Sequence, residues 1–316
     1  MLVSTCRRTL LNTYAKMKAR LVWLILCCIW GSTWLFIKLG LEDLPPLTFA
    51  GIRFVIACSI LLVIIRIRGL QLPRSSSDLK LLALTGVLSF TVNYGTIFWG
   101  EQYIPSGLAA VLQATIPAFG LVIAHFYLPG ERMTWAKLFG VALGVIGVAV
   151  VFSNQLAIAG GKALAGSVAV VVGSAVVAYS NVLVKARGEK LDPAILAAGQ
   201  MFFGLIPLLI LGISLEENPL KFHWTARAVL SLFYLAIVGS VIAFLLYYWL
   251  VQNMDVTKSM LIALVTPVVA VIVGMIVLRE ELNWRTIVGG AMIMSGIGFI
   301  VLQKRRKDRA ELVTSA

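Results

Sequence analysis

Charged residues are scarce in this sequence, and acidic residues are the scarcest. Only 13% of the 316 residues are charged, and 14 of them are Asp or Glu, whereas soluble domains average about 25% charged residues. Hydrophobic residues make up 60% of the chain and the mean hydropathy is +0.95. This composition excludes a soluble enzyme and predicts a polytopic membrane protein.

The acidic residues are also absent from the middle of every long apolar run. A carrier that exchanges protons for cationic drugs usually needs a carboxylate inside the membrane, which argues against the small four-helix multidrug antiporters. His125, near the end of an apolar run, is interpreted as packed or interfacial, with titration as the alternative. Coupling by Glu101, or by a gradient of the substrate itself, stays open.

Motifs of metal and catalytic sites are missing as well. The four cysteines, Cys6, Cys27, Cys28 and Cys58, have no spacing typical of zinc or a redox pair, so we expect free thiols. The chain has no HExxH, no serine–histidine–aspartate set and no phosphate-binding loop. We therefore expect no enzymatic activity, no cofactor and no bound metal.

Ten apolar runs are long enough to cross a bilayer, which takes about 20 residues of helix. We predict an all-α integral membrane protein whose ten transmembrane helices span roughly 21–41, 46–66, 79–100, 106–127, 135–153, 165–184, 193–214, 226–251, 257–278 and 285–303. The turns between them are short, so the chain has no extramembrane domain large enough for a separate active site.

The distribution of Lys and Arg predicts that both termini are cytoplasmic. With that orientation 20 of the 27 basic residues lie in inside segments and six outside, and the remaining one is Arg53. Cytoplasmic loops collect Lys and Arg, so the net charge of +13 needs no nucleic-acid partner. The predicted location is the plasma membrane, most simply the inner membrane of a bacterium or archaeon.

The two halves of the chain repeat each other. ERMTWAKLFGVALGVIGVAVVF (131–152) aligns with EELNWRTIVGGAMIMSGIGFIV (280–301) at an offset of 149. At an offset of 150 Trp99, Gln102 and Pro117 fall on Trp249, Gln252 and Pro267, and at 147 Arg53 falls on Gln200. Five spans in each half invert the second half relative to the first, an arrangement typical of alternating-access transporters.

These boundaries divide the chain into five parts. We predict a cytoplasmic N-terminal segment (1–20), a first five-helix repeat (21–153), a linker (154–164), a second repeat (165–303) and a basic cytoplasmic tail (304–316).

A set of motifs in order along residues 20 to 302 resembles the EamA-type carriers of the drug/metabolite transporter superfamily. The motifs are WGSTWLFIK (30–38), LPPLTFAGIRF (44–54), SGLAAVLQATIP (106–117) and GERMTWAKLFGVALGVIGV (130–148). The second half departs from the pattern in LREEL (278–282), where the glycine is missing and the glutamate is kept. The resemblance implies a ten-helix inverted-repeat carrier, and many such relatives export amino acids and related metabolites.

Pro117 and Pro267 lie near the middle of predicted spans at matching places in the two halves. Proline removes one helix hydrogen bond, which would free the carbonyls of Gln113 and Ala263. Paired interruptions in the two halves of a transporter point to its substrate site. Because the positions are symmetric, we favour a substrate cavity here over a packing kink alone.

Polar and aromatic residues at comparable depth form the candidate substrate cavity. The resemblance supports this grouping, because spans 1, 3, 4, 6, 8 and 9 line the cavity in relatives. The alternative is that Ser and Thr bond their own helix and the aromatic residues lie in interface belts. The candidates are Trp30, Ser32, Thr33, Asn93, Tyr94, Gln113, Pro117, Tyr179, Asn181, Tyr247 and Pro267, with Trp99, Thr115, Ser180, Tyr248 and Thr266 at similar depth.

Arg53 places a permanent charge inside an apolar run, at a cost of about 3 kcal/mol or more on insertion scales. It could bind a substrate carboxylate. Alternatively its role is structural, by snorkelling or by bonding a neighbouring helix. Its repeat partner Gln200 can hydrogen-bond without charge, which favours the structural interpretation slightly.

Glycines in the fifth and tenth runs predict close helix packing. Gly140, Gly144 and Gly147 form a small-residue face, and Gly289 and Gly296 mirror it. Such faces let helices approach each other, either between the two halves or in a homodimer.

The sequence therefore predicts a secondary transporter of small polar metabolites in the lipid bilayer, with amino-acid export as the first hypothesis. The alternatives are a carrier of other organic solutes, such as sugars or drugs, and a membrane sensor or scaffold that does not transport.

Overall fold

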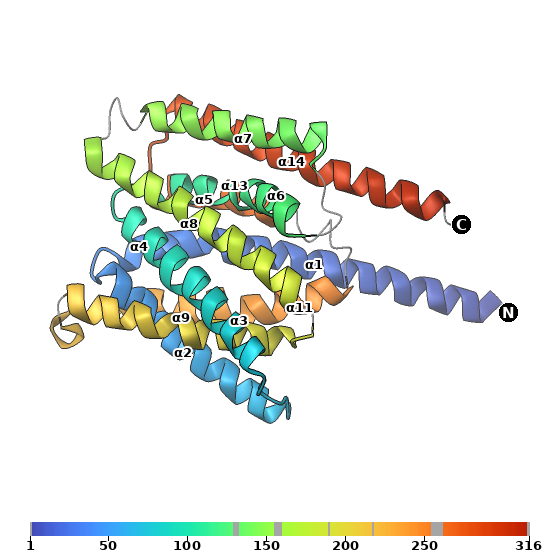
Figure 1. Cartoon of the computed structure of the whole chain (residues 1–316), viewed down its shortest axis with the longest axis horizontal. Helices are drawn as coiled ribbons and strands as arrows, with labels where there is room; N and C mark the ends of the chain where they lie inside the picture. The colour runs from blue at the N-terminus through green and yellow to red at the C-terminus, as the bar shows by residue number, and fades with distance from the viewer. Residues whose placement is uncertain are drawn as a thin grey trace.

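The computed structural model describes residues 2–128, 133–154, 160–188, 190–216, 218–253 and 262–314, and the regular elements in these ranges are all helices (Figure 1). Glu131 of the predicted repeat, and residues 155–159 of the predicted linker, lie outside the described residues. The elements of the first half are α1 (Leu2–Gly40), α2 (Pro46–Ile67), α3 (Ser76–Gly86), η1 (Val87–Asn93), α4 (Tyr94–Glu101), α5 (Ser106–Gln113), α6 (Ile116–Tyr127) and α7 (Trp135–Asn154).

The second half follows the same order of long and broken helices. Its elements are α8 (Gly160–Arg187), α9 (Pro193–Leu215), η3 (Pro219–Lys221), α10 (Ala226–Phe233), η4 (Tyr234–Ile242), α11 (Ala243–Asn253), α13 (Ile262–Val277) and α14 (Trp284–Thr314).

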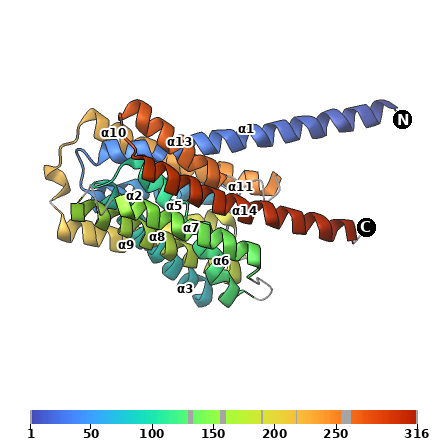
Figure 2. The same cartoon turned by 90° about the horizontal axis from the view of Figure 1, so that it is seen from above.

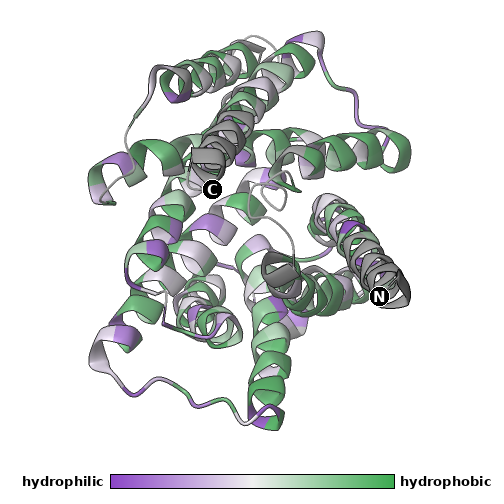
Figure 3. Cartoon of the chain, turned by 90° about the vertical axis from the view of Figure 1, so that its right-hand side faces the viewer, coloured by the Kyte–Doolittle hydropathy of each residue, from purple (hydrophilic) through white to green (hydrophobic). Residues whose placement is uncertain are grey.

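Seven helices of the described residues are long and apolar enough to cross a membrane, and two shorter apolar helices accompany them. The helices carry mostly hydrophobic residues along their length (Figure 3). Outward side chains such as Ile210, Ile213 and Leu215 of α9 are exposed, although large exposed apolar surfaces are rare on soluble monomers. The multi-pass, all-helical class is confirmed, and the count of ten spans stays a prediction.

Both termini lie at one end of the bundle (Figures 1 and 2). We call the opposite end, where α1 and α4 end and α2 and α5 begin, the distal end. Prolines mark the start of α2 at this end and the start of its counterpart α9 in the second half. Pro46 and Pro193 stand in the first turns of α2 and α9, where a missing backbone N–H costs no hydrogen bond.

The two halves are interleaved rather than side by side. Helix α2 packs on α9, and at this contact a Cβ added to Gly212 would lie 2.9 Å from the backbone N of Thr48. The Cys58 thiol donates to the carbonyl of Ala198 on α9 at 3.6 Å. Helices α7 and α14 form a second contact of this kind (Figure 1).

Glycines make the contact between α7 and α14. A Cβ added to Gly147 would lie 2.6 Å from the carbonyl oxygen of Gly289, and one added to Gly296 would collide with the carbonyl of Gly140. The glycine faces therefore bring two helix backbones of the same chain together, which is one of the two kinds of packing that the sequence predicts, and the homodimer stays a prediction.

Two π-helical segments occupy matching places in the halves. Shifting η1 by the repeat offset of 150 places it on residues 237–243, which overlap η4. Segments with π hydrogen bonding are rare in helices and frequent at functional sites. Here η1 packs on α9 and η4 packs on α2, so each π segment faces a helix of the other half.

The two mid-span prolines differ in their effect. In the first half the helix ends at Gln113 and α6 begins at Ile116, with Pro117 in its first turn. In the second half α13 continues through Pro267. The predicted symmetric pair of interruptions is therefore a break in one half only, among the residues that the structure describes.

We expect Gly147→Ala to destabilise the protein, because the added methyl group meets the backbone of α14 and overpacking costs about 1–3 kcal/mol. The matched control is Gly144→Ala on the same helix, where an added Cβ meets nothing within 4 Å. Thermal unfolding in detergent should show a lower midpoint for Gly147→Ala alone, and equal midpoints for the two variants would contradict this contact.

Candidate functional site

The Arg53 guanidinium lies in the protein interior between helices of both halves. Its side chain is 2% exposed, so it does not snorkel to either membrane surface. The Nε group donates to the Ser240 hydroxyl of η4 at 3.2 Å. The rings of Phe54, Tyr94 and Phe98 surround the charge at 5.1, 5.3 and 6.0 Å from the guanidinium carbon, which are cation–π distances.

Ser240 is positioned by the π segment that carries it. Its hydroxyl donates to the carbonyl of Leu235, five residues earlier, at 2.9 Å, and it accepts from Arg53. The Nη1 group of Arg53 is buried and has no hydrogen-bond partner among the described residues. A buried charged donor without a partner is costly. The Nη1 group could therefore donate a hydrogen bond to an acceptor that enters the space between the three rings.

Gln200, the repeat partner of Arg53, lies on α9 against α3 and is half-buried. A Cβ added to Gly86 of α3 would collide with the Gln200 carbonyl oxygen. Both residues lie where helices of the two halves meet, but the surrounding aromatic rings are described for Arg53 alone.

A chain of hydrogen bonds joins three helices near the broken span. Gln113 Nε2 donates to Asn93 Oδ1 at 2.8 Å, and the Ser174 hydroxyl of α8 donates to Gln113 Oε1 at 2.7 Å. The Thr96 hydroxyl donates to the Asn93 carbonyl at 2.8 Å. The structure therefore brings together two of the candidate cavity residues, Asn93 and Gln113, and it adds Ser174, which the sequence did not single out.

A second group of predicted residues lies between α1 and the eighth predicted span. The Trp30 ring packs on the Tyr247 ring with their centroids 5.4 Å apart. The Ser32 hydroxyl lies 2.6 Å from the hydroxyl of Tyr234. Tyr234 is not among the residues that the sequence predicted for the cavity. Thr33 donates to the Trp30 carbonyl at 2.7 Å, so it bonds its own helix.

The remaining candidates make no hydrogen bond or ring contact with these two groups among the interactions of the described residues. Tyr179 contacts Tyr127, with 3.5 Å between the hydroxyls. Asn181 is exposed, whereas its neighbour Ser180 is buried and lies 2.8 Å from the Ser89 hydroxyl. Pro117 is half-buried and Pro267 is buried.

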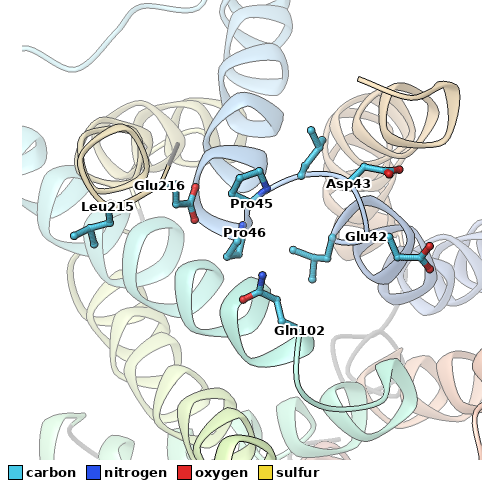
Figure 4. A pocket seen from close by; sticks show the side chains of 9 residues that line it. Glu42, Asp43, Pro45, Pro46, Gln102, Leu215 and Glu216 are labelled. Atoms are coloured by element: carbon cyan, nitrogen blue, oxygen red, sulfur yellow. The ribbon is translucent and has the colours of Figure 1, made fainter. Parts of the chain in front are cut away.

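A pocket of about 620 Å³ opens at the distal end, and none of the candidate cavity residues lines it (Figure 4). Gln102, Pro45 and Pro46 form part of its wall. The Thr225 hydroxyl donates to Asp43 in its rim at 2.6 Å, and with Arg227 it holds the pKa of Asp43 below its usual range.

Two carboxylates that the sequence analysis did not assign bind helix N-termini at the distal end. Glu216, which lines the pocket, accepts from the backbone N–H groups of Leu47 and Thr48 at 2.7 and 2.8 Å. Glu280 accepts from Ser106 and Gly107 at 2.7 and 3.2 Å. Each carboxylate comes from the second half and neutralises the positive end of a helix in the first.

Comparison with protein families finds one match that occurs twice in the chain. The profile described as the EamA-like transporter family matches residues 17–153 and again residues 164–302. A solved crystal structure of a protein with 19% identity covers 92% of this chain and 98% of that chain with a TM-score of 0.65, which shows a shared fold.

Several curated relatives carry the name transporter. The uncharacterized transporter YoaV of Bacillus subtilis is 29% identical and covers 85% of this chain and 91% of its own length. The uncharacterized inner membrane transporter YedA of Escherichia coli is 32% identical over 78% of each chain. A protein of Streptantibioticus cattleyicolor named "Probable terminal-alkyne amino-acid exporter" is 30% identical and covers 92% of this chain and 97% of its own.

We expect Gln113→Leu to destabilise the protein by about 1–3 kcal/mol, because it removes the donor to the Asn93 side-chain oxygen in the interior, while Ser174 keeps its bond to the Val170 carbonyl. The control is Gln102→Leu, which changes an exposed glutamine. Unfolding midpoints in detergent provide the measurement, and a Gln113→Leu midpoint equal to that of the control would contradict a structural role for this hydrogen-bonded chain.

Proposed function

Because the chain belongs to the EamA-like transporter family, we propose that it is a secondary carrier that exports amino acids or their derivatives by alternating access. The resemblance seen in the sequence is confirmed, and the chain is a multi-pass membrane transporter. Transporters, as its relatives are named, are generally not enzymes. The substrate and the direction of transport are the proposal.

The substrate class rests on two observations. A relative of 30% identity carries the name "Probable terminal-alkyne amino-acid exporter". The Nη1 group of the buried Arg53 guanidinium has no hydrogen-bond partner within the part of the chain that the structure describes, and the Tyr94 ring lies beside the guanidinium. A cationic donor enclosed by aromatic rings matches a carboxylate on a small organic molecule, and this observation carries the proposal.

The mechanism rests on the interleaving of the halves. We propose ten spans in two inverted repeats, 21–153 and 165–303, with both termini in the cytoplasm of a bacterial or archaeal cell. The paired π segments η1 and η4 each face a helix of the other half. Rocking of one half against the other would then change the access to groups between them, including Arg53 and the chain of Asn93, Gln113 and Ser174.

The decisive experiment is counterflow in liposomes that contain the purified protein. Liposomes are loaded with one unlabelled amino acid at a time, from a panel with aromatic, hydroxyl-bearing and sulfur-containing members, and uptake of the labelled form is followed. Saturable exchange of at least one member supports the proposal. Folded protein that exchanges none of the panel contradicts it and directs the search to sugars, drugs or a sensor.

Arg53→Gln, which copies the repeat partner, tests the role of the charge. If the guanidinium binds the substrate carboxylate, counterflow of the amino acid should fall by about tenfold or more, since a hydrogen bond to a charged group contributes about 1.5–3 kcal/mol. The control is Arg66→Gln, an exposed arginine on the same helix.

Amino esters that lack the carboxylate complete the test. Wild type and Arg53→Gln should exchange these esters at the same rate, because the esters have no carboxylate for the guanidinium to bind. Unchanged amino-acid exchange by a folded Arg53→Gln protein would assign Arg53 a structural role only.

A further inference from the structure

Glu101, the last residue of α4, is a fully buried acidic side chain at the distal end. Its exposure is 0%, and neither carboxylate oxygen has a hydrogen-bond partner among the described residues. Buried carboxylates are normally paired or hydrogen-bonded, so this group requires an explanation.

The charged groups around Glu101 do not supply the missing partners. The Lys38 ammonium of α1 donates to the backbone carbonyls of Glu101 and Ile104 at 2.5 and 2.9 Å. The Glu280 carboxylate, beyond α13, is bound to the N-terminus of α5. Lys38 and Glu280 are the two charges that act on the Glu101 carboxyl, and they oppose each other.

The other elements packed on α4 add no charge that pairs with Glu101. Helix α8 approaches through Gly166, whose carbonyl faces Gly100, and its Lys162 lies over the Tyr103 ring at 5.9 Å. Arg53 of α2 contacts the rings of Tyr94 and Phe98, which lie on α4 together with Glu101. The Ser106 hydroxyl at the start of α5 is also buried, and no described residue hydrogen-bonds to it.

We propose that Glu101 is the proton-binding site of this carrier and that it exchanges its proton with water at the distal end. A bare carboxylate without donors is costly in a dry interior, and binding a proton removes the charge. Proton binding rests on the geometry alone, whereas its use in transport rests on the function proposed above.

The step moves a proton and nothing else. On opening, the Glu101 carboxyl gives its proton to a water molecule and becomes a carboxylate that water and the Lys38 ammonium stabilise. On closing, it takes a proton from water and becomes neutral again. No other bond forms or breaks.

The distal contacts show how opening would reach Glu101. Glu280 holds the N-terminus of α5, which follows Glu101 after a short turn, to the chain beyond α13. Separation of these elements admits water to the buried carboxyl. Helix α4 also carries Tyr94, whose ring lies on Arg53, so one rigid helix connects the proton site to the proposed substrate group.

Infrared spectroscopy tests proton binding without any substrate. At neutral pH exposed carboxyl groups are ionised, so the C=O stretch of a protonated carboxyl reports buried acids. Wild type and the control Glu281→Gln, an exposed neighbour of Glu280, should show this band, and Glu101→Gln should lose it. A band that is absent from wild type, or unchanged in Glu101→Gln, overturns the proposal.

Transport in liposomes tests the coupling. An imposed pH gradient should drive accumulation of the amino acid found by counterflow in wild type and Glu281→Gln. In Glu101→Gln this accumulation should be lost while counterflow stays measurable, and Glu101→Asp should restore part of it. Accumulation by Glu101→Gln equal to wild type, or accumulation driven by a Na⁺ gradient instead, overturns the coupling role.

The two experiments separate the two proposals. If wild type exchanges no amino acid but shows the Glu101 carboxyl band, the proposed substrate fails and the proton site stands. If amino-acid exchange occurs without the band, the proton site fails and the carrier function stands.

Discussion

The close approach of helix backbones from the two halves is the contact on which the rest of this structure depends. Lipid offers no hydrophobic driving force between helices, so small residues that allow close packing must provide the attraction. Gly147 and Gly289 do so between α7 and α14, and Gly212 does so between α9 and α2. Because α2 is held on the second half, Arg53 reaches Ser240 of η4.

The arrangement of the interior follows from the same interleaving. Each π segment faces a helix of the other half, so the polar groups that the segments expose find partners across the boundary. Thr91 of η1 donates to the Gly204 carbonyl of α9 at 2.6 Å, and Ser240 of η4 accepts from Arg53 of α2. The boundary between the halves therefore holds both the tight glycine contacts and the buried polar groups.

The sequence predicts the helices, the family and the close packing of the glycine faces, because these depend on hydropathy and on local residue patterns. It groups Asn93, Gln113 and Asn181 in one candidate cavity, and the structure joins the first two whereas Asn181 is exposed, because depth along a span does not show which face of the helix a side chain takes. It predicts a symmetric effect of Pro117 and Pro267 that the structure does not show, because the repeat cannot reveal how each helix absorbs its proline. Contacts of Glu216 and Glu280 with distant N–H groups depend on tertiary packing, which no local pattern records.

The carboxylates of Glu216 and Glu280 accept hydrogen bonds from main-chain N–H groups rather than from side chains. Any amino acid except proline presents the same donor at those positions. The side chains at these positions are constrained by other contacts, because Thr48 and Ser106 are buried and a Cβ added to Gly107 would lie 3.1 Å from Val271. The two attachments that join the halves at the distal end therefore depend on where the backbones of α2 and α5 lie rather than on the side chains that these helices carry.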